Sequence, residues 1–147
     1  MKNTHFILLK PNTPLKKKFL GAFIGEIDGK ESTNMKDFLI KIGEAMNFPD
    51  YDGKNLDALD EMLNDLEWIK QEKVIIHIRN TADWLSKEKA SDKILTLIDI
   101  FDATAEDWEW MDDEDEQGSK IIKIVFDDSE RIRAILDEQE IPFAVLD

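Results

Sequence analysis

The sequence predicts an α/β fold with a mainly parallel sheet, and three observations support this prediction. Short apolar runs alternate along the chain with longer segments whose apolar residues recur at helical spacing. Two of the runs, KVIIHIR (73–79) and KIIKIVF (120–126), are almost continuously apolar, which is typical of strands buried on both faces. No internal repeat or flexible linker interrupts the pattern, so we expect a single domain over residues 1–147.

The first third of the chain is expected to contain two strands and a helix. HFILL (5–9) is a short apolar run ended by KPNTP, and FLGAFIGEID (19–28) predicts a second strand that ends in an Asp-Gly turn. Ser32 or Thr33 is expected to cap the helix that follows and runs to about residue 46. The apolar residues that recur at helical spacing in it are Phe38, Leu39, Ile42, Ala45 and Met46.

The second half continues the alternation. The 73–79 run is expected to lie centrally in the sheet, and residues 81–101 predict one or two helices. Residues 102–119 are rich in Asp and Glu and predict an acidic surface loop, in which Trp108 and Trp110 project from one face of an extended segment or pin the loop to the body. The remaining elements are the 120–126 strand, a helix over 127–140 with an acidic first turn and a short strand over 141–147.

Composition and charge exclude several classes of protein. The net charge of −14 repels nucleic acid and anionic membranes, so we expect neither as a direct partner. The absence of Cys excludes disulfides, thiol nucleophiles and Cys-based zinc sites. The apolar run near the N-terminus is too short for a signal peptide, and no segment is long enough to span a bilayer, so a cytoplasmic location is expected.

The stretch FPDYDGKNLDALDEML (48–63) predicts a turn followed by an amphipathic helix. Gly53 is expected to adopt a positive φ, and Asn55 is expected to cap a helix that runs to about Leu66. At about 100° per residue, one face of this helix is apolar. The opposite face carries Asp57, Asp60, Glu61, Asn64 and Asp65.

No Lys or Arg lies between Asn55 and Trp68, so no neighbour on the helix neutralises these acids. Carboxylates near the N-terminus favour the helix dipole, whereas Glu61 and Asp65 oppose it. Two interpretations remain open: a solvated face, or a surface that binds cations of another molecule.

This stretch also resembles the signature segment of the barstar family, the intracellular inhibitors of barnase-type ribonucleases. The matching residues are Pro49, Tyr51, Gly53, Asn55, Leu56, Asp57, Ala58, Leu59 and the acid at position 61. The resemblance is strong over about residues 20–66 and looser to about residue 126. The first twenty residues and the tail after 127 are expected to be additions to the family's pattern.

The resemblance implies a small, mainly parallel barstar-like sheet flanked by helices, to which the additions can contribute edge strands. It implies that the loop and the second helix plug a ribonuclease active site, where their acids mimic RNA phosphates. Tyr51 would contact the partner, Gly53 would allow close approach, and Asn55 would brace the helix. Asp57 would be an acidic contact, and Glu61 lies where the family has the Asp that reaches deepest into the phosphate site.

Other positions depart from the family's pattern, which leaves the identity of the target nuclease open. Asp60 and Asp52 stand where aromatic residues are expected, and Asp99 or Asp102 would match a further acidic contact on the later helix. The predicted partner-binding residues are Tyr51, Asp52, Gly53, Asn55, Asp57, Asp60, Glu61, Asn64, Asp99 and Asp102.

The predicted function is therefore a monomeric, immunity-type inhibitor of a basic ribonuclease or nuclease toxin. The alternative is an acidic interaction module on the same fold that binds a basic partner without nuclease activity. An enzyme is not expected, because no nucleophile–base pair or phosphate loop is visible, His77 lies in an apolar strand and His5 in a mobile end. No cofactor or metal is expected, since the calcium-loop resemblance of residues 113–118 has Ile124 at its twelfth position.

Overall fold

The computed structural model describes residues 4–88, 91–110 and 119–147. Within these ranges the strands form one sheet in the order β2-β3-β4-β1-β5, and every neighbouring pair is parallel. This confirms the predicted α/β class. The strands are β1 (Phe6–Leu9), β2 (Phe23–Asp28), β3 (Lys73–Arg79), β4 (Ile121–Asp127) and β5 (Phe143–Leu146).

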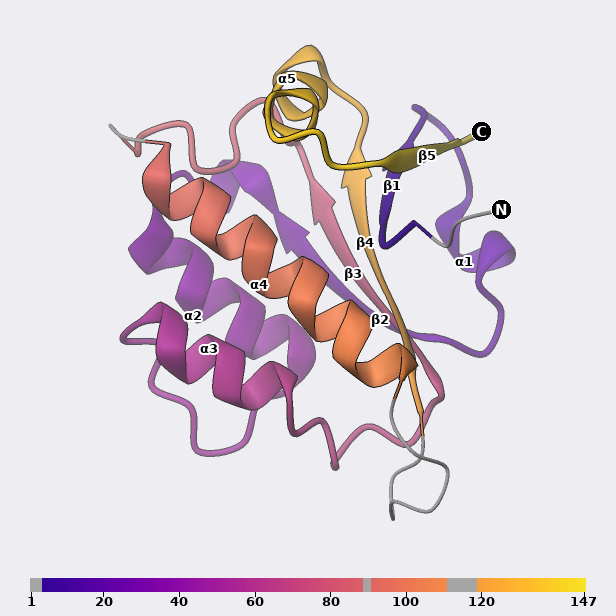
Figure 1. Cartoon of the computed structure of the whole chain (residues 1–147), viewed down its shortest axis with the longest axis vertical. Helices are drawn as coiled ribbons and strands as arrows, with labels where there is room; N and C mark the ends of the chain where they lie inside the picture. Colours follow the sequence, from indigo (N-terminus) through magenta and orange to yellow (C-terminus); the bar gives the residue numbers. More distant parts are fainter. Residues whose placement is uncertain (1–3, 89–90, 111–118) are drawn as a thin grey trace.

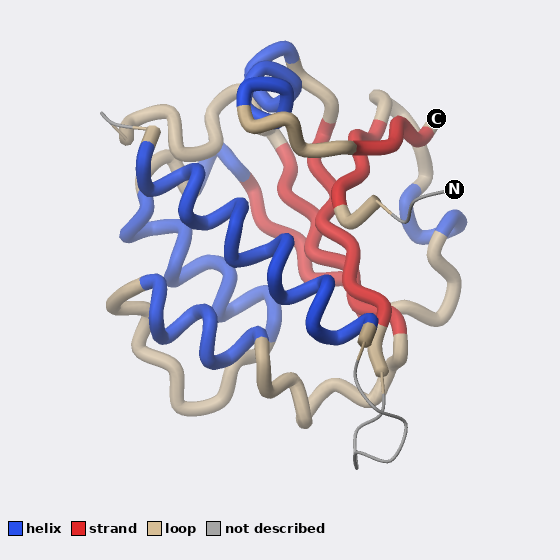
Figure 2. Tube along the Cα trace, viewed as in Figure 1, coloured by secondary structure: helices blue, strands red, loops and turns tan. Residues whose placement is uncertain are grey.

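The helices cover the sheet unevenly (Figures 1 and 2). α2, α3 and α4 lie together over one face, α5 lies beyond the carboxyl ends of the strands, and α1 lies on the opposite side of the sheet. In the described part of the chain no helix has the length and apolar character needed to cross a membrane. The helices are α1 (Leu15–Lys18), α2 (Met35–Met46), α3 (Leu56–Leu63), α4 (Asp92–Glu109) and α5 (Glu130–Glu138), with a 3₁₀ turn at Gly29–Glu31.

Successive side chains of the interior strands point to opposite faces of the sheet, and both faces are covered, which explains why these strands are almost continuously apolar. On β3, Val74, Ile76 and Ile78 face the core beneath α2–α4, whereas Ile75 packs into a smaller core on the other side. The smaller core lies under the α1 segment, where Leu15 is buried. Both faces of β3 are thus removed from water between its two end residues, as its apolar run predicted.

The first strand lies inside the sheet. β1 pairs with β4 on one side, Phe6 opposite Ile124, and with β5 on the other, Phe6 opposite Phe143. The N-terminal segment therefore joins the C-terminal strand to the rest of the sheet. β3 is an interior strand as expected, but β4 occupies the middle position.

The start of α2 differs from the prediction. Asn34 is the N-cap, and its side chain accepts a hydrogen bond from the Asp37 amide at 2.8 Å. Ser32 is buried and donates to the carbonyl of Asp28 at 2.7 Å, so it closes the preceding 3₁₀ turn. The prediction that Ser32 or Thr33 caps this helix is therefore wrong.

The predicted loop over 102–119 is wrong for its first part, because α4 continues to Glu109. Phe101, Ala105 and Trp108 recur at helical spacing and are buried, which extends the helix despite its acidic surface. Trp108 donates its indole N–H to the carbonyl of Leu63 at 2.8 Å, whereas Trp110 is 75% exposed, so the two do not share one face. Residues 111–118 lie outside the described residues.

An ion pair connects three elements at the carboxyl ends of the strands. Arg133 of α5 donates to both carboxylate oxygens of Asp128, at 2.7 and 2.8 Å, and Lys10 lies 3.3 Å from the same carboxylate. The Asp128 amide also donates to the carbonyl of Leu9. The hydrogen bonds from Arg133 and Lys10 outweigh the effect of burial, so the pKa of Asp128 lies below its usual value.

The first prediction concerns Trp108. Trp108→Phe removes the hydrogen bond to Leu63 and part of a buried side chain, so we expect the free energy of unfolding to fall by about 2 kcal/mol. Chemical denaturation measures this change. The matched substitution Trp110→Phe affects an exposed indole and should stay within about 0.5 kcal/mol of the wild type. Equal effects of the two substitutions would contradict the burial of Trp108 and its hydrogen bond to Leu63.

The second prediction concerns the pH dependence of stability. A carboxylate whose pKa is lower in the folded protein stabilises it above the unfolded pKa, and this stabilisation is lost as pH falls through the folded pKa. Asp128→Asn should therefore destabilise the protein at pH 7 and weaken the decline of wild-type stability below about pH 4. Denaturation midpoints across pH 2–7 test this, with Asp99→Asn as the control. Parallel curves for wild type and Asp128→Asn would refute it.

Candidate functional site

The loop before α3 and the first turn of that helix are held in a defined conformation. Asn55 is the N-cap of α3, and its side chain accepts from the Ala58 amide at 2.8 Å, which confirms the predicted cap. Gly53 has a φ of 67°, as predicted, and lies buried against Ile40 and Leu39 of α2. The loop is thus fixed at both its turn and its junction with the helix.

α3 presents its acids to solvent. Asp57, Asp60 and Glu61 are exposed within an arc of about 100° on the helix. Asp65 follows in the turn after Leu63, where α3 ends instead of at the expected Leu66. We refer to Asp57, Asp60, Glu61 and Asp65 as the α3 carboxylate row.

The α3 carboxylate row is not neutralised from within the described part of the chain. No Lys, Arg or His in residues 4–88, 91–110 or 119–147 lies within ion-pair distance of its members. Lys36, Lys54 and Lys93 line the same surface hollow as Asp57, but none is paired with it. The row is therefore available to cations of another molecule.

Asn64 belongs to the end of the helix. Its amide donates to the Asp60 carbonyl at 2.8 Å and to the Asp60 carboxylate at 3.0 Å. The Asp60 carbonyl also accepts from the backbone amide of Asn64 at 3.1 Å, so both amide groups of Asn64 bind the last turn of the helix. Asn64 thus orients Asp60.

Asp52 has a local partner. Its carboxylate accepts from the Lys54 amide at 3.1 Å, and the Lys54 ammonium lies 3.8 Å away. This is an Asx turn with a neighbouring cation, so Asp52 shapes the loop and its charge is partly balanced.

Tyr51 packs against α2. A Cβ at Gly43 would lie 2.5 Å from the Tyr51 ring, so the absence of a side chain at Gly43 creates the space for this ring. The ring also meets Phe48 edge to face at 5.0 Å. The buried hydroxyl has no hydrogen-bond partner among the described residues, and burial together with nearby Asp52 raises the pKa of Tyr51 to about 12.

Asp99 and Asp102 lie on a different side of α4 from its contact with α3. Asp102 accepts from the His5 ring at 2.7 Å, and Asp99 precedes it by one turn on the same stripe. Trp108, which contacts α3, lies about 120° around the helix from Asp102. The structure therefore separates these two acids from the α3 carboxylate row.

His5 is not at a mobile end, contrary to the expectation. Its side chain is 10% exposed and contacts carboxylates of α4. Local pattern does not reveal this contact, because residue 5 and residues 102–109 are distant along the chain. Asp65 was absent from the predicted contacts, although its exposed position follows from the helical spacing that identified the other acids.

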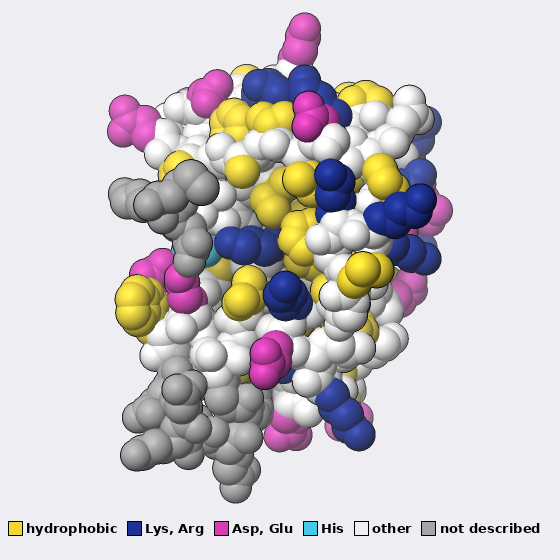
Figure 3. All heavy atoms as spheres, turned by 90° about the vertical axis from the view of Figure 1, so that its right-hand side faces the viewer, with side chains coloured by type: hydrophobic (Ala, Val, Ile, Leu, Met, Phe, Trp, Pro, Cys, Tyr) yellow, Lys and Arg dark blue, Asp and Glu magenta, His cyan; other side chains and the backbone are white. Residues whose placement is uncertain are grey.

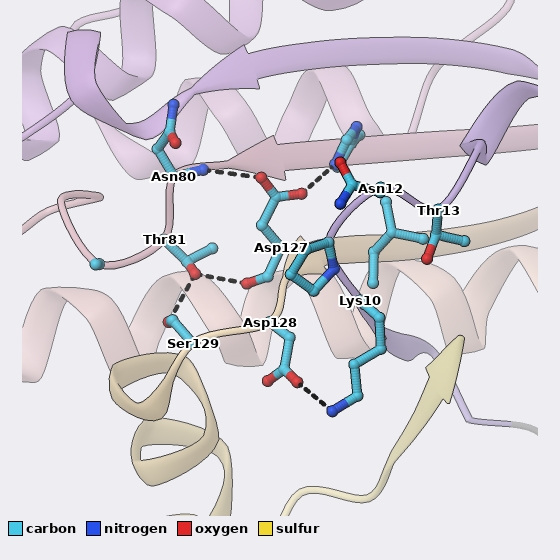
Figure 4. Close-up of a pocket in the computed structure, with 12 residues that line it drawn as sticks. Lys10, Asn12, Thr13, Asn80, Thr81, Asp127, Asp128 and Ser129 are labelled. Atoms are coloured by element: carbon cyan, nitrogen blue, oxygen red, sulfur yellow. Dashed lines mark hydrogen bonds and ion pairs between the residues drawn. The ribbon is translucent and has the colours of Figure 1, made fainter. Parts of the chain in front are cut away.

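A second hollow lies at the carboxyl ends of β1, β3 and β4 (Figure 4), where ligands of open parallel sheets commonly bind. Its polar groups bind one another. Asp127 accepts from His77 at 2.8 Å and from the Asn80 amide at 3.2 Å, and Thr81 bonds both the Asp127 carbonyl and the Ser129 hydroxyl. Burial raises the pKa of Asp127, but the hydrogen bonds and the nearby positive charge together outweigh it, so this pKa lies below its usual value. Since Ser129 is bonded to Thr81 and not to His77, no activated nucleophile is assembled among these described residues.

Charge is distributed unevenly over the molecule. Figure 3 shows the side that carries α1, where Lys and Arg side chains lie among hydrophobic ones. Exposed Lys16, Lys17 and Lys18 come from α1 itself. The net charge of −14 is therefore not uniform, and the unpaired acids of α3 form a distinct local surface.

Comparison with known proteins agrees with this arrangement. A protein-family model described as Barstar (barnase inhibitor) matches residues 22–146. No curated protein matches the chain. The match includes α5 and β5, so the expectation that the tail after residue 127 is an addition is wrong, whereas β1 and α1 precede the matched range.

The third prediction concerns the unpaired hydroxyl of Tyr51. Tyr51→Phe removes a buried polar group without a partner and keeps the ring over Gly43, so we expect the free energy of unfolding to stay the same or rise by up to about 1 kcal/mol. Thermal and chemical denaturation measure this. A loss above about 1 kcal/mol would show that the hydroxyl is bonded in solution.

Proposed function

The chain belongs to the barstar family, and from this premise we propose that it inhibits a basic ribonuclease by covering the active site with the 47–55 loop and α3. The observation that carries the proposal is the α3 carboxylate row, which is exposed and has no cation partner among the described residues. A ribonuclease cleft is basic because it binds RNA phosphates. Carboxylates spaced along one helix face can occupy the same Arg and Lys groups.

The position of the acids along α3 supports a role in binding. Glu61 lies in the last turn of α3 and Asp65 in the turn that follows it, where negative charge opposes the helix dipole, and no basic residue lies in the last turn. This arrangement slightly disfavours the free protein. A cation supplied by the partner would relieve both the dipole interaction and the repulsion between neighbouring acids.

The rigidity of the surface also favours tight binding. Leu59 and Leu63 are completely buried, and Asn55 caps the first turn, so the exposed acids stand on a fixed support. A surface that is ordered before binding loses less conformational entropy when the complex forms.

The proposed mechanism requires no chemistry by this chain. Asp57, Asp60 and Glu61 would bind cations of the nuclease, while Gly53 and the half-buried ring of Tyr51 would allow the loop to approach closely. Asn55 would hold the helix start. RNA would be excluded because the acids of α3 fill the phosphate-binding sites of the nuclease and the bound helix blocks its cleft.

The remaining predicted contacts have supporting or peripheral roles in this proposal. Asp52 and Asn64 would keep the loop and Asp60 in position through their bonds within the chain. Asp99 and Asp102 would lie at most at the edge of the interface, because their side of α4 differs from the side that contacts α3.

The fourth prediction tests this surface with barnase-type and other basic ribonucleases. Glu61→Gln and Asp57→Asn should each weaken inhibition of RNA cleavage by about 2–5 kcal/mol, the range typical when one partner of a buried interfacial charge pair is removed. Inhibition constants from a fluorescent RNA substrate give the change. The association rate of the wild type should fall steeply with added salt.

The matched control is Glu138→Gln, which removes the same charge from an exposed position on α5. It should leave inhibition within about threefold of the wild type, or about 0.6 kcal/mol. If all three variants inhibit equally, α3 is not the contact surface. If the wild type binds a basic protein but no RNA cleavage is blocked, the alternative of a general acidic interaction module replaces the proposal.

A further inference from the structure

A histidine and three carboxylates meet where the segment before β1 crosses the last turns of α4. Asp102, Glu106 and Glu109 recur at spacings of four and three residues, so they lie on one stripe of α4. His5 lies against this stripe, with its side chain 10% exposed. We refer to these four residues as the His5 cluster.

The hydrogen bond to Asp102 determines which nitrogen of His5 is free. The Asp102 carboxylate only accepts hydrogen bonds, so Nδ1 of His5, at 2.7 Å from it, carries the proton. In the neutral ring Nε2 then presents a lone pair. That lone pair faces carboxylate oxygens of Glu106 and Glu109, each 3.5 Å away, which are also acceptors. A cation placed between these three groups would interact favourably with all of them.

The distances match a metal ion better than a proton. An N–H···O hydrogen bond is about 2.7–3.2 Å long, so a proton on Nε2 would make only weak bonds at 3.5 Å. For Zn²⁺, with ligand distances of about 2.1 Å and tetrahedral angles, neighbouring ligand atoms are about 3.4 Å apart. The three candidate ligand atoms of His5, Glu106 and Glu109 all lie within 4.8 Å of one another.

The orientation of His5 is also that of a metal ligand. Histidines that bind metals commonly donate their second ring N–H to a carboxylate, which fixes the ring and makes the ligating nitrogen more basic. Asp102 occupies this position.

The electrostatic surroundings favour a cation. The cluster lies at the carboxyl end of α4, whose last turn contains no basic residue, so the helix dipole adds negative potential. On the neighbouring strand β4, Lys123 donates to the carbonyl of Thr4. Its charge also interacts with Glu109.

We propose that Nε2 of His5 and the carboxylates of Glu106 and Glu109 bind one divalent transition-metal ion of the Zn²⁺ class, with Asp102 as the residue that positions the ring. The three ligand residues also line a surface hollow with Trp110 and Pro142, from which water could supply a fourth ligand. A bound ion would join the start of β1 to the last turn of α4. Because β1 holds β5 in the sheet, the ion would stabilise the arrangement of both termini.

This site is independent of the proposed inhibitor surface. His5 precedes the range matched by the family model, and the cluster lies on the side of α4 away from α3. The calcium-loop pattern considered in the sequence is a continuous segment, whereas this site joins residue 5 to residues 106 and 109 only through the fold.

The fifth prediction is a titration of the full chain with Zn²⁺ in the presence of a chelating indicator. The wild type should bind one equivalent, and excess Mg²⁺, which prefers oxygen ligands and retains its water, should not displace it. Glu106→Gln and Glu109→Gln should each weaken binding at least about tenfold, and Asp102→Asn about tenfold through the orientation of His5. Zn²⁺ should raise the melting temperature of the wild type but not of Glu106→Gln.

The matched control is Asp107→Asn, which removes an exposed carboxylate of α4 next to Glu106 but outside the cluster. Its affinity for Zn²⁺ should stay within about twofold of the wild type, or about 0.4 kcal/mol. Equal losses of Zn²⁺ affinity in Asp107→Asn and Glu106→Gln, or full displacement of Zn²⁺ by Mg²⁺, would overturn the proposal. Either result would show that Zn²⁺ is attracted to the acidic chain without a specific site. If His5→Gln folds and binds Zn²⁺ as tightly as the wild type, the proposal also fails.

Discussion

The acidic surface of this protein depends on the burial of the opposite side of the same helix. α3 has eight residues, which is too few for a stable helix in isolation, and repulsion between its acids disfavours it further. Leu59 and Leu63 compensate because they are completely buried, and the Trp108 indole binds the Leu63 carbonyl. The α3 carboxylate row can therefore remain unpaired because apolar contacts and one hydrogen bond from α4 hold α3 in place.

Carboxylates in this chain fall into two groups according to their partners. Asp127 binds His77, and Asp128 binds Arg133 and Lys10. These bonds connect strands and α5 at the carboxyl ends of the strands. The acids of α3 have no such partner among the described residues. A paired carboxylate has already exchanged water for a protein cation, whereas an exposed unpaired one can do so in a complex. Only the second group suits the binding of a basic partner.

The two ends of the chain depend on each other. β1 lies between β4 and β5, so the C-terminal strand joins the sheet only through the N-terminal one. The same N-terminal segment brings His5 to the acidic stripe of α4. Residues that precede the family match thus complete the sheet and create a group of potential ligands that the matched range does not contain by itself.

The sequence by itself determined the order of the main elements, the parallel sheet, the cap at Asn55 and the acidic arc of α3, because all of these follow from periodicity and local hydrogen bonding. Tertiary structure alone decided the position of β1, the length of α4, the inward packing of Tyr51 and the meeting of His5 with Asp102, Glu106 and Glu109. The N-cap of α2 is Asn34 and not the predicted Ser32 or Thr33, because the Ser32 hydroxyl donates to the carbonyl of Asp28 instead. Contacts between residues that are distant in the chain depend on how the helices and strands pack. The spacing of apolar and polar residues within one segment does not predict them.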